Sequence, residues 1–241
     1  MRTFTNTILP LGTADAIRIM AYHNSSGKTW FETQKVQFND VPISIDQDVS
    51  TNEFLEATES MTTIFDLLGS AVFTPIKQDL LFNVRRVRTR QQQAPEVSET
   101  LQSLVRGELS LKAQPATEAI IWIVRGLDFM TEVFMIEMQA AACESVPGCQ
   151  SKELANSFKE SYEITLQPYH NTFIRLIFKT ALNAAPKRKN FYQALIGDHA
   201  DSKTGDAVMN QWATSLKNIV TILKEFLASD EALSKWAKTK V

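Results

Sequence analysis

One stretch of this sequence, residues 73–90, combines polar and apolar side chains in a pattern suited to ligand binding. If the stretch is helical, Asp79, Asn83 and Arg86 fall at positions i, i+4 and i+7 and share one face. A carboxylate, an amide and a guanidinium can together hydrogen-bond the hydroxyl groups and the amide of a polar head group. The apolar residues beside them, including Phe73 and Ile76, suit a ligand whose remaining part is apolar.

Two further residues, Trp122 and His170, would complete such a site if the fold brought them to the same place. An indole face can stack on a sugar ring, and an imidazole can hydrogen-bond a lipid amide. Each residue also has a plainer interpretation, with Trp122 as core packing and His170 as a hydrogen-bonded core histidine. The three polar residues likewise fit an exposed network on a helix surface. The residue types alone leave both interpretations open.

Other kinds of chemistry find little support in the sequence. It contains no glycine-rich nucleotide loop, no CxxC pair and no HExxH motif, and His23, His170 and His199 are far apart. We therefore predict a protein that is not an enzyme and that has neither a metal site nor a cofactor.

Composition narrows the class of protein further. The 241 residues carry a formal net charge of -2, which argues against a nucleic-acid partner. No apolar run reaches about 18 residues, so we expect no membrane-spanning segment. The two cysteines, Cys143 and Cys149, are expected to be free thiols in a reducing compartment, although their closeness also permits a bridge. On this basis we predict a cytoplasmic protein.

Apolar periodicity predicts an all-α fold. We expect a poorly ordered extension over residues 1–28 and one domain over residues 29–241. Helices are expected at 51–68, with an interruption at Gly69, and at 73–92, 94–111, 117–142, 151–166, 168–182 and 207–228. Segment 119–124 is apolar on all sides, so its helix should be central and buried. Gly126, in the same helix, should let a neighbouring element approach closely.

Several of these segments together resemble the glycolipid transfer protein family, over roughly residues 51–241. The similar segments are FLEATES (54–60), FDLLGS (65–70), Val72-Phe73, Asp79 with Asn83, WIVRGL (122–127), Tyr169-His170 and AAP (184–186). Among relatives, the chain looks closest to the fungal heterokaryon-incompatibility C-type glycolipid transfer proteins. The resemblance implies a two-layer all-α fold with a lipid site between the layers, and no covalent chemistry.

The resemblance also implies roles for individual residues. Asp79, Asn83 and Arg86 would bind the sugar head group, Trp122 would stack on the sugar, and His170 would bond the ceramide amide region. Apolar positions would line a tunnel for the lipid chains, and the C-terminal valine would close the site. The implied tunnel positions are Val72, Phe73, Ile76, Phe129, Val133, Leu166, Phe178 and Val241.

The sequence departs from the family pattern at two places. The family lysine is Arg86 here, which keeps the charge but adds a planar fork and bulk. The exposed aromatic that the family often carries two residues after the histidine is Thr172 here. We expect other residues to contact the membrane. For the basic residues among them, the alternative is an ordinary solvated loop. The expected membrane contacts are Phe173, Lys187, Arg188, Lys189, Phe191 and Tyr192.

The function that the resemblance implies is non-vesicular transfer of glycosphingolipids between membranes, with a transient membrane surface as partner. A ceramide-1-phosphate carrier is a lower-ranked alternative, because that branch has cationic residues where this chain has Asn83 and Trp122. A third reading is a glycolipid sensor that signals to a protein partner. The segment TTIFDLL (62–68) resembles the one that some relatives offer to endoplasmic-reticulum membrane proteins, and it equally fits a buried helix.

Overall fold

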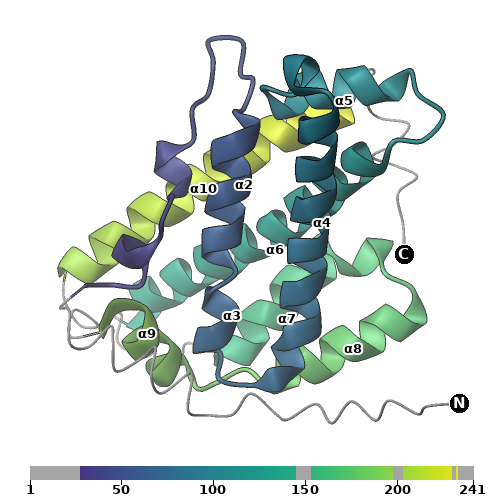
Figure 1. Cartoon of the computed structure of the whole chain (residues 1–241). Coiled ribbons are helices and arrows are strands. Elements are labelled where there is room, and N and C mark those ends of the chain that lie inside the picture. Colours follow the sequence, from purple (N-terminus) through teal and green to yellow (C-terminus); the bar gives the residue numbers. More distant parts are fainter. Residues whose placement is uncertain (1–27, 145–152, 198–202, 230–231, 233–241) are drawn as a thin grey trace, which may run out of the picture.

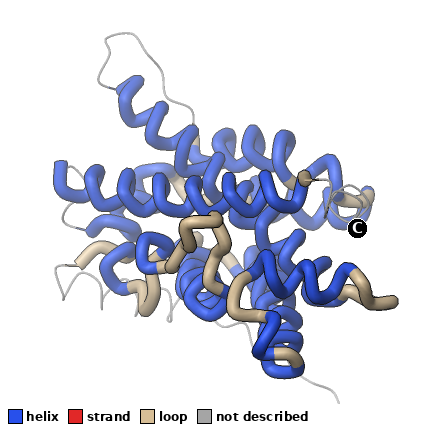
Figure 2. Tube along the Cα trace, turned by 90° about the horizontal axis from the view of Figure 1, so that it is seen from above, coloured by secondary structure: helices blue, strands red, loops and turns tan. Residues whose placement is uncertain are grey.

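Most of the chain that the computed structural model describes is helical. The described residues are 28–144, 153–197, 203–229 and 232, so the expected extension at 1–28 lies almost wholly outside them. Within these ranges the structure contains no β-strand and only two isolated bridges, Ile43 with Val49 and Ser50 with Thr100. Figure 2 shows helices joined by loops, which confirms the all-α prediction.

The longest helix, α6 (Pro115–Glu144), is the centre of the molecule. It packs against α4 (Thr74–Gln93), α5 (Leu101–Leu109), α7 (Leu154–Thr165) and α10 (Lys203–Ala228). Its segment 119–124 is buried on every side except at Trp122, as the all-round apolar sequence predicted.

Two groups of helices cross each other around this centre. In Figure 1, α2 (Thr51–Met61) and α4 stand side by side in the foreground, and α6 and α10 cross behind them. The short α3 (Ile64–Leu67) follows α2, and α8 (Thr172–Asn183) packs against α7. The remaining helices are α9 (Arg188–Ile196) and the short 3-10 turns η1 (Phe31–Thr33), η2 (Phe38–Asp40), η3 (Ala71–Phe73), η4 (Pro95–Val97) and η5 (Gln167–Tyr169).

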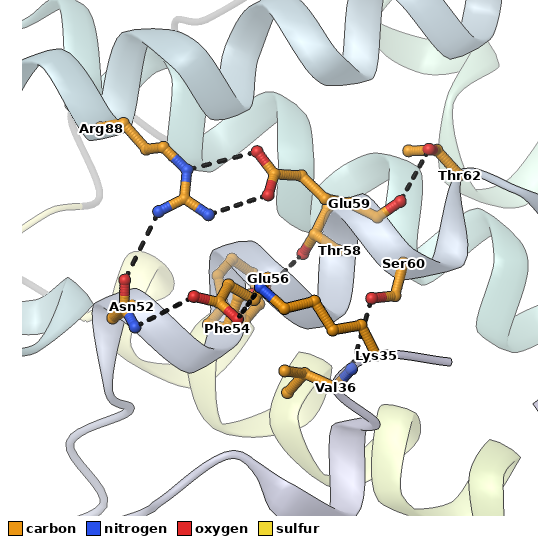
Figure 3. A network of polar contacts seen from close by, with 10 residues as sticks. All are labelled: Lys35, Val36, Asn52, Phe54, Glu56, Thr58, Glu59, Ser60, Thr62 and Arg88. Atoms are coloured by element: carbon orange, nitrogen blue, oxygen red, sulfur yellow. Dashed lines mark hydrogen bonds and ion pairs between the residues drawn. The ribbon is translucent and has the colours of Figure 1, made fainter. Parts of the chain in front are cut away.

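A polar network holds α2 against α4 (Figure 3). The guanidinium of Arg88 donates to both carboxylate oxygens of Glu59, at 3.2 and 2.8 Å, and to the Asn52 side chain at 3.4 Å. Asn52 also donates to Glu56 at 3.4 Å, and Glu56 pairs with Lys35 at 3.2 Å. The arginine pairing is bidentate, so it fixes the orientation of α4 about its own axis as well as its distance from α2.

The segment that begins at Thr29 packs into the folded body. Trp30 and Phe31 are buried in an aromatic cluster with Phe38, Phe134 and Trp212, whose ring centroids lie 5.0–6.1 Å apart. The backbone N–H of Trp30 also donates to the carbonyl of Leu195 at 2.7 Å. The domain boundary at residue 28 stays a prediction, because the preceding residues lie outside the described part.

Two helices are shorter than the periodicity predicted. The expected helix 51–68 already breaks at Thr62 and Thr63, whose hydroxyls donate to the carbonyls of Glu59 and Ser60 at 2.7 and 2.8 Å. Such local bonds compete with the helix ladder. The expected helix 94–111 is η4 followed by α5, which has its own cap at Thr100.

Cys143 is disulfide-bonded, so the expectation of two free thiols is wrong. The close spacing of the two cysteines in the sequence had left a bridge open as the alternative.

None of the helices in the described ranges is both long and apolar enough to cross a bilayer.

Candidate functional site

A cavity of about 430 Å³ lies among α4, α6 and the segment that leads into α8. Asp79, Asn83 and Arg86 of α4 line it, together with Trp122 of α6 and His170. The other lining residues are almost all apolar: Met61, Phe65, Pro75, Ile76, Leu80, Phe82, Gly126, Phe129, Met130, Leu166, Ile174, Ile177 and Phe178. The five residues predicted for a head group therefore meet in one cavity, although they come from three separate parts of the chain.

The α4 residues form a connected polar face, as their spacing predicted. The side-chain amide of Asn83 donates to the Asp79 backbone carbonyl at 3.0 Å and to the Asp79 carboxylate at 3.3 Å. Arg86 in turn donates to the Asn83 side-chain oxygen at 3.3 Å. Asn83 is buried while Asp79 is open to solvent, so the face runs from the inner wall of the cavity to its mouth.

Trp122 and His170 stack on each other in the lining of the cavity. Their ring centroids are 5.6 Å apart and their planes differ by 22°. His170 Nδ1 lies 3.2 Å from the Tyr162 hydroxyl, and the ring also contacts Phe178 at 4.8 Å. The hydroxyl fixes the ring orientation through Nδ1, which leaves Nε2 as the imidazole atom for a ligand.

Arg125, which the sequence reading did not select, is a buried cation behind this aromatic wall. Its guanidinium carbon lies 3.5 Å from the ring centroid of Tyr169 and 5.1 Å from that of Trp122. Burial lowers the pKa of Arg125 to about 10, against the influence of Tyr169, so the side chain remains charged at neutral pH. An arginine within WIVRGL, one turn from the cavity-lining tryptophan, was the only signal in the sequence that could have identified it.

The surroundings set the protonation of two site residues. Burial, together with the charges of Arg125 and Arg175, lowers the pKa of His170 to about 4. The imidazole is therefore neutral near pH 7, when each ring nitrogen is either a donor or an acceptor. Although Asp79 stays open to solvent on one side, partial desolvation beside the apolar lining raises the pKa of its carboxyl, and the nearby charge of Arg86 partly opposes this.

The predicted tunnel positions divide into three groups. Ile76, Phe129, Leu166 and Phe178 line the cavity itself. Phe73 lines a narrow apolar void of about 10 Å³, which shares Phe65, Ile76, Phe129, Met130 and Phe178 with the cavity and therefore continues it. Val133 is fully buried and Val72 is half-buried, and neither lines these two spaces. Val241 lies outside the described residues.

The structure corrects part of the expected membrane-contact set. Phe173 is 69% exposed on α8, and Lys187 and Lys189 are also exposed. Phe191 is buried in the core, and Tyr192 is partly buried. Arg188 is tied to the buried Glu137 at 2.8 Å, so these three residues do not form the exposed basic and aromatic patch that the sequence suggested.

The structure also shows where the segment TTIFDLL (62–68) lies. The segment 62–68 is mostly buried, and its Phe65 lines the cavity, which corresponds to the buried-helix alternative rather than to an exposed recognition segment. Among the described residues, no group of three or more His, Cys, Asp or Glu side chains could hold a metal ion.

Comparisons with known proteins point in the same direction as this geometry. The sequence model of the family described as "Glycolipid transfer protein (GLTP)" matches residues 49–197. A glycolipid transfer protein from Aureobasidium melanogenum is 42% identical over 210 residues, which are 87% of this chain and 97% of that protein.

Solved structures share the fold. The crystal structure of HET-C2, described as a fungal glycolipid transfer protein, matches with a TM-score of 0.76 at 42% identity and covers 85% of this chain and 99% of its own. Human ceramide-1-phosphate transfer protein, in complex with 2:0 ceramide-1-phosphate, matches with a TM-score of 0.71 at 16% identity, covering 86% and 98%. At that identity the second likeness concerns the fold alone.

Proposed function

This chain belongs to the glycolipid transfer protein family, and we propose that it carries glycosphingolipids between membranes. The observation that supports this most is the composition of the cavity lined by the α4 polar face. Asp79, Asn83 and Arg86 form a connected polar face on α4, Trp122 and His170 add a stacked aromatic pair, and the other lining residues are apolar. A sugar linked to two hydrocarbon chains has the same division of polar and apolar parts.

The head-group roles follow from donor and acceptor chemistry. Asp79 would accept hydrogen bonds from sugar hydroxyls, and Asn83 would both donate and accept. The exposed part of the Trp122 ring would stack on the apolar face of the sugar. The neutral His170 would bond the amide of the ceramide, with its ring held by Tyr162. A lipid without a sugar would supply no hydroxyl groups to replace the water displaced from Asp79 and Asn83, which disfavours its binding.

The apolar part of the cavity lowers the cost of removing a lipid from a bilayer. Exposing hydrocarbon to water costs about 0.8 kcal/mol per CH₂, or about 24 kcal/mol for roughly thirty such groups. A cavity that accepts the chains as they leave the membrane avoids most of that exposure. Because the continuation beyond Phe129 is only about 10 Å³, we propose that its aromatic side chains move apart as a chain enters.

Membrane contact is best assigned to α8. This helix turns Ile174, Ile177 and Phe178 into the cavity, while Phe173 and Leu176 remain 69% and 62% exposed. If these two exposed side chains enter the bilayer surface, the mouth of the cavity lies close to the lipid that it takes up.

The test is transfer between donor and acceptor vesicles, measured with fluorescent galactosylceramide, lactosylceramide and ceramide-1-phosphate. Transfer of the two sugar lipids supports the proposal, and transfer of the phosphate lipid alone would contradict it. Binding of sugar lipids without transfer would favour the glycolipid sensor instead.

A further inference from the structure

The cation at the mouth of the cavity is engaged by the protein itself. Arg86 uses one terminal guanidinium nitrogen to donate to Asn83 at 3.3 Å and the other to pair with Glu118 of α6, also at 3.3 Å. Its guanidinium also lies over the ring of Phe82, 5.8 Å from the centroid. Each of the two terminal nitrogens that would donate to a phosphate therefore already has a partner in the protein, and the charge is compensated by Glu118.

Glu118 stands one helical turn before Trp122, on the same side of α6. Its side chain is 45% exposed, and neither the sequence reading nor the lining of the cavity singles it out. Together with Asp79, it places two carboxylates beside the one guanidinium of Arg86 at this rim. The other nearby cation, Arg125, is buried behind the rings of Trp122 and Tyr169.

We propose that Glu118 is a specificity-determining residue that excludes anionic head groups, and this rests on the proposed glycolipid function. By pairing with Arg86, Glu118 compensates the positive charge that would otherwise attract a phosphate or a sulfate. The site then accepts uncharged sugars, whose hydroxyls can donate to carboxylates.

An anionic head group meets two obstacles in this arrangement. It must displace Glu118 from Arg86, and it must then lie beside a carboxylate of like charge. A repulsion between unit charges several ångströms apart at a partly solvated site corresponds to about a tenfold change in affinity, or 1.4 kcal/mol. Glu118→Gln keeps the shape of the side chain and removes its charge, so it breaks the ion pair and leaves the charge of Arg86 uncompensated, while the amide oxygen still accepts a hydrogen bond.

The experiment compares two lipids that differ only by one anionic group, galactosylceramide and its 3-sulfate, with the same acyl chain. Equilibrium binding of each is measured for the wild-type chain and for Glu118→Gln. We expect the variant to shift the affinity ratio about tenfold towards the sulfated lipid. Adding Arg86→Gln to the variant should abolish the shift, because the gain depends on the uncompensated guanidinium.

Glu59→Gln is the matched control. Glu59 of α2 pairs with Arg88, which lies on α4 as Arg86 does. The side-chain exposures of this pair, 38% and 27%, resemble the 45% and 26% of Glu118 and Arg86. The control should leave the ratio unchanged. An unchanged ratio in Glu118→Gln, with galactosylceramide still bound, overturns the inference alone. If the wild-type chain binds no galactosylceramide, the proposed function fails and the inference fails with it.

Discussion

Replacing Gly126 by alanine should stabilise this protein, although glycine lines the cavity at the centre of the longest helix. The nearest atom to a Cβ built at this position, outside the helix backbone, is Leu80 Cδ1 at 3.9 Å, which is an ordinary contact. A neighbouring element does not press against Gly126, so the sequence-based expectation of a close approach is wrong. In a helix interior, alanine is favoured over glycine by about 1 kcal/mol.

The expected size of this effect can be measured directly. For a chain of this length, about 1 kcal/mol corresponds to a rise in Tm of about 2–4 °C. The matched control is Gly107→Ala in α5, where a new Cβ would lie only 3.4 Å from Val97 Cγ2. That contact should cancel part of the gain, so Gly107→Ala should stabilise less than Gly126→Ala. Thermal unfolding of both variants by circular dichroism provides the measurement.

A larger side chain at the same position tests the role of the cavity. Gly126→Leu would project into the space beside Trp122, where it should lower galactosylceramide affinity roughly tenfold or more through overpacking against the ligand. A fall in Tm for Gly126→Ala would refute the conclusion that a Cβ fits at this position without a clash. Unchanged lipid binding by Gly126→Leu would show that the head group does not lie against this wall.

Three further outcomes are expected. Asp79→Val should lower glycolipid transfer about 10- to 100-fold through the loss of charge-assisted hydrogen bonds, with unchanged helicity by circular dichroism, and normal transfer would remove Asp79 from the site. The fold lowers the pKa of His170 from an ordinary 6.5 to about 4. As the pH falls, His170 is therefore protonated in the unfolded chain before it is protonated in the folded one. The stability from neutral His170, about 3 kcal/mol, should therefore be complete above pH 6.5 and be lost by pH 4, and denaturant unfolding of His170→Gln should lack this dependence. Phe173→Ala should weaken association with vesicles and slow transfer, while Tm and binding of detergent-solubilised glycolipid stay unchanged because Phe173 is exposed; equal vesicle association would place the membrane contact elsewhere.

The sequence by itself determined the helical class and the polar face of α4. Asp79, Asn83 and Arg86 share that face because the spacing is a property of one helix, and the structure adds only the hydrogen bonds between them. The long α6 was likewise predictable, because a segment that is apolar on all sides must be buried. Helix breaks were harder to predict, since those at Thr62 and Ser98 depend on local side-chain bonds that compete with the helix ladder.

Tertiary structure alone decided which distant residues act together. The stack of Trp122 on His170 and the pairing of Arg86 with Glu118 join residues from different parts of the chain, and no periodicity within one segment encodes such a distance. The family resemblance pointed to Trp122 and His170 but not to Glu118 or Arg125. The same reason explains the error at Phe191, whose neighbours in sequence are basic and exposed while its own side chain packs against Phe158. Burial is a property of the assembled helices, and charged neighbours in the sequence do not reveal it.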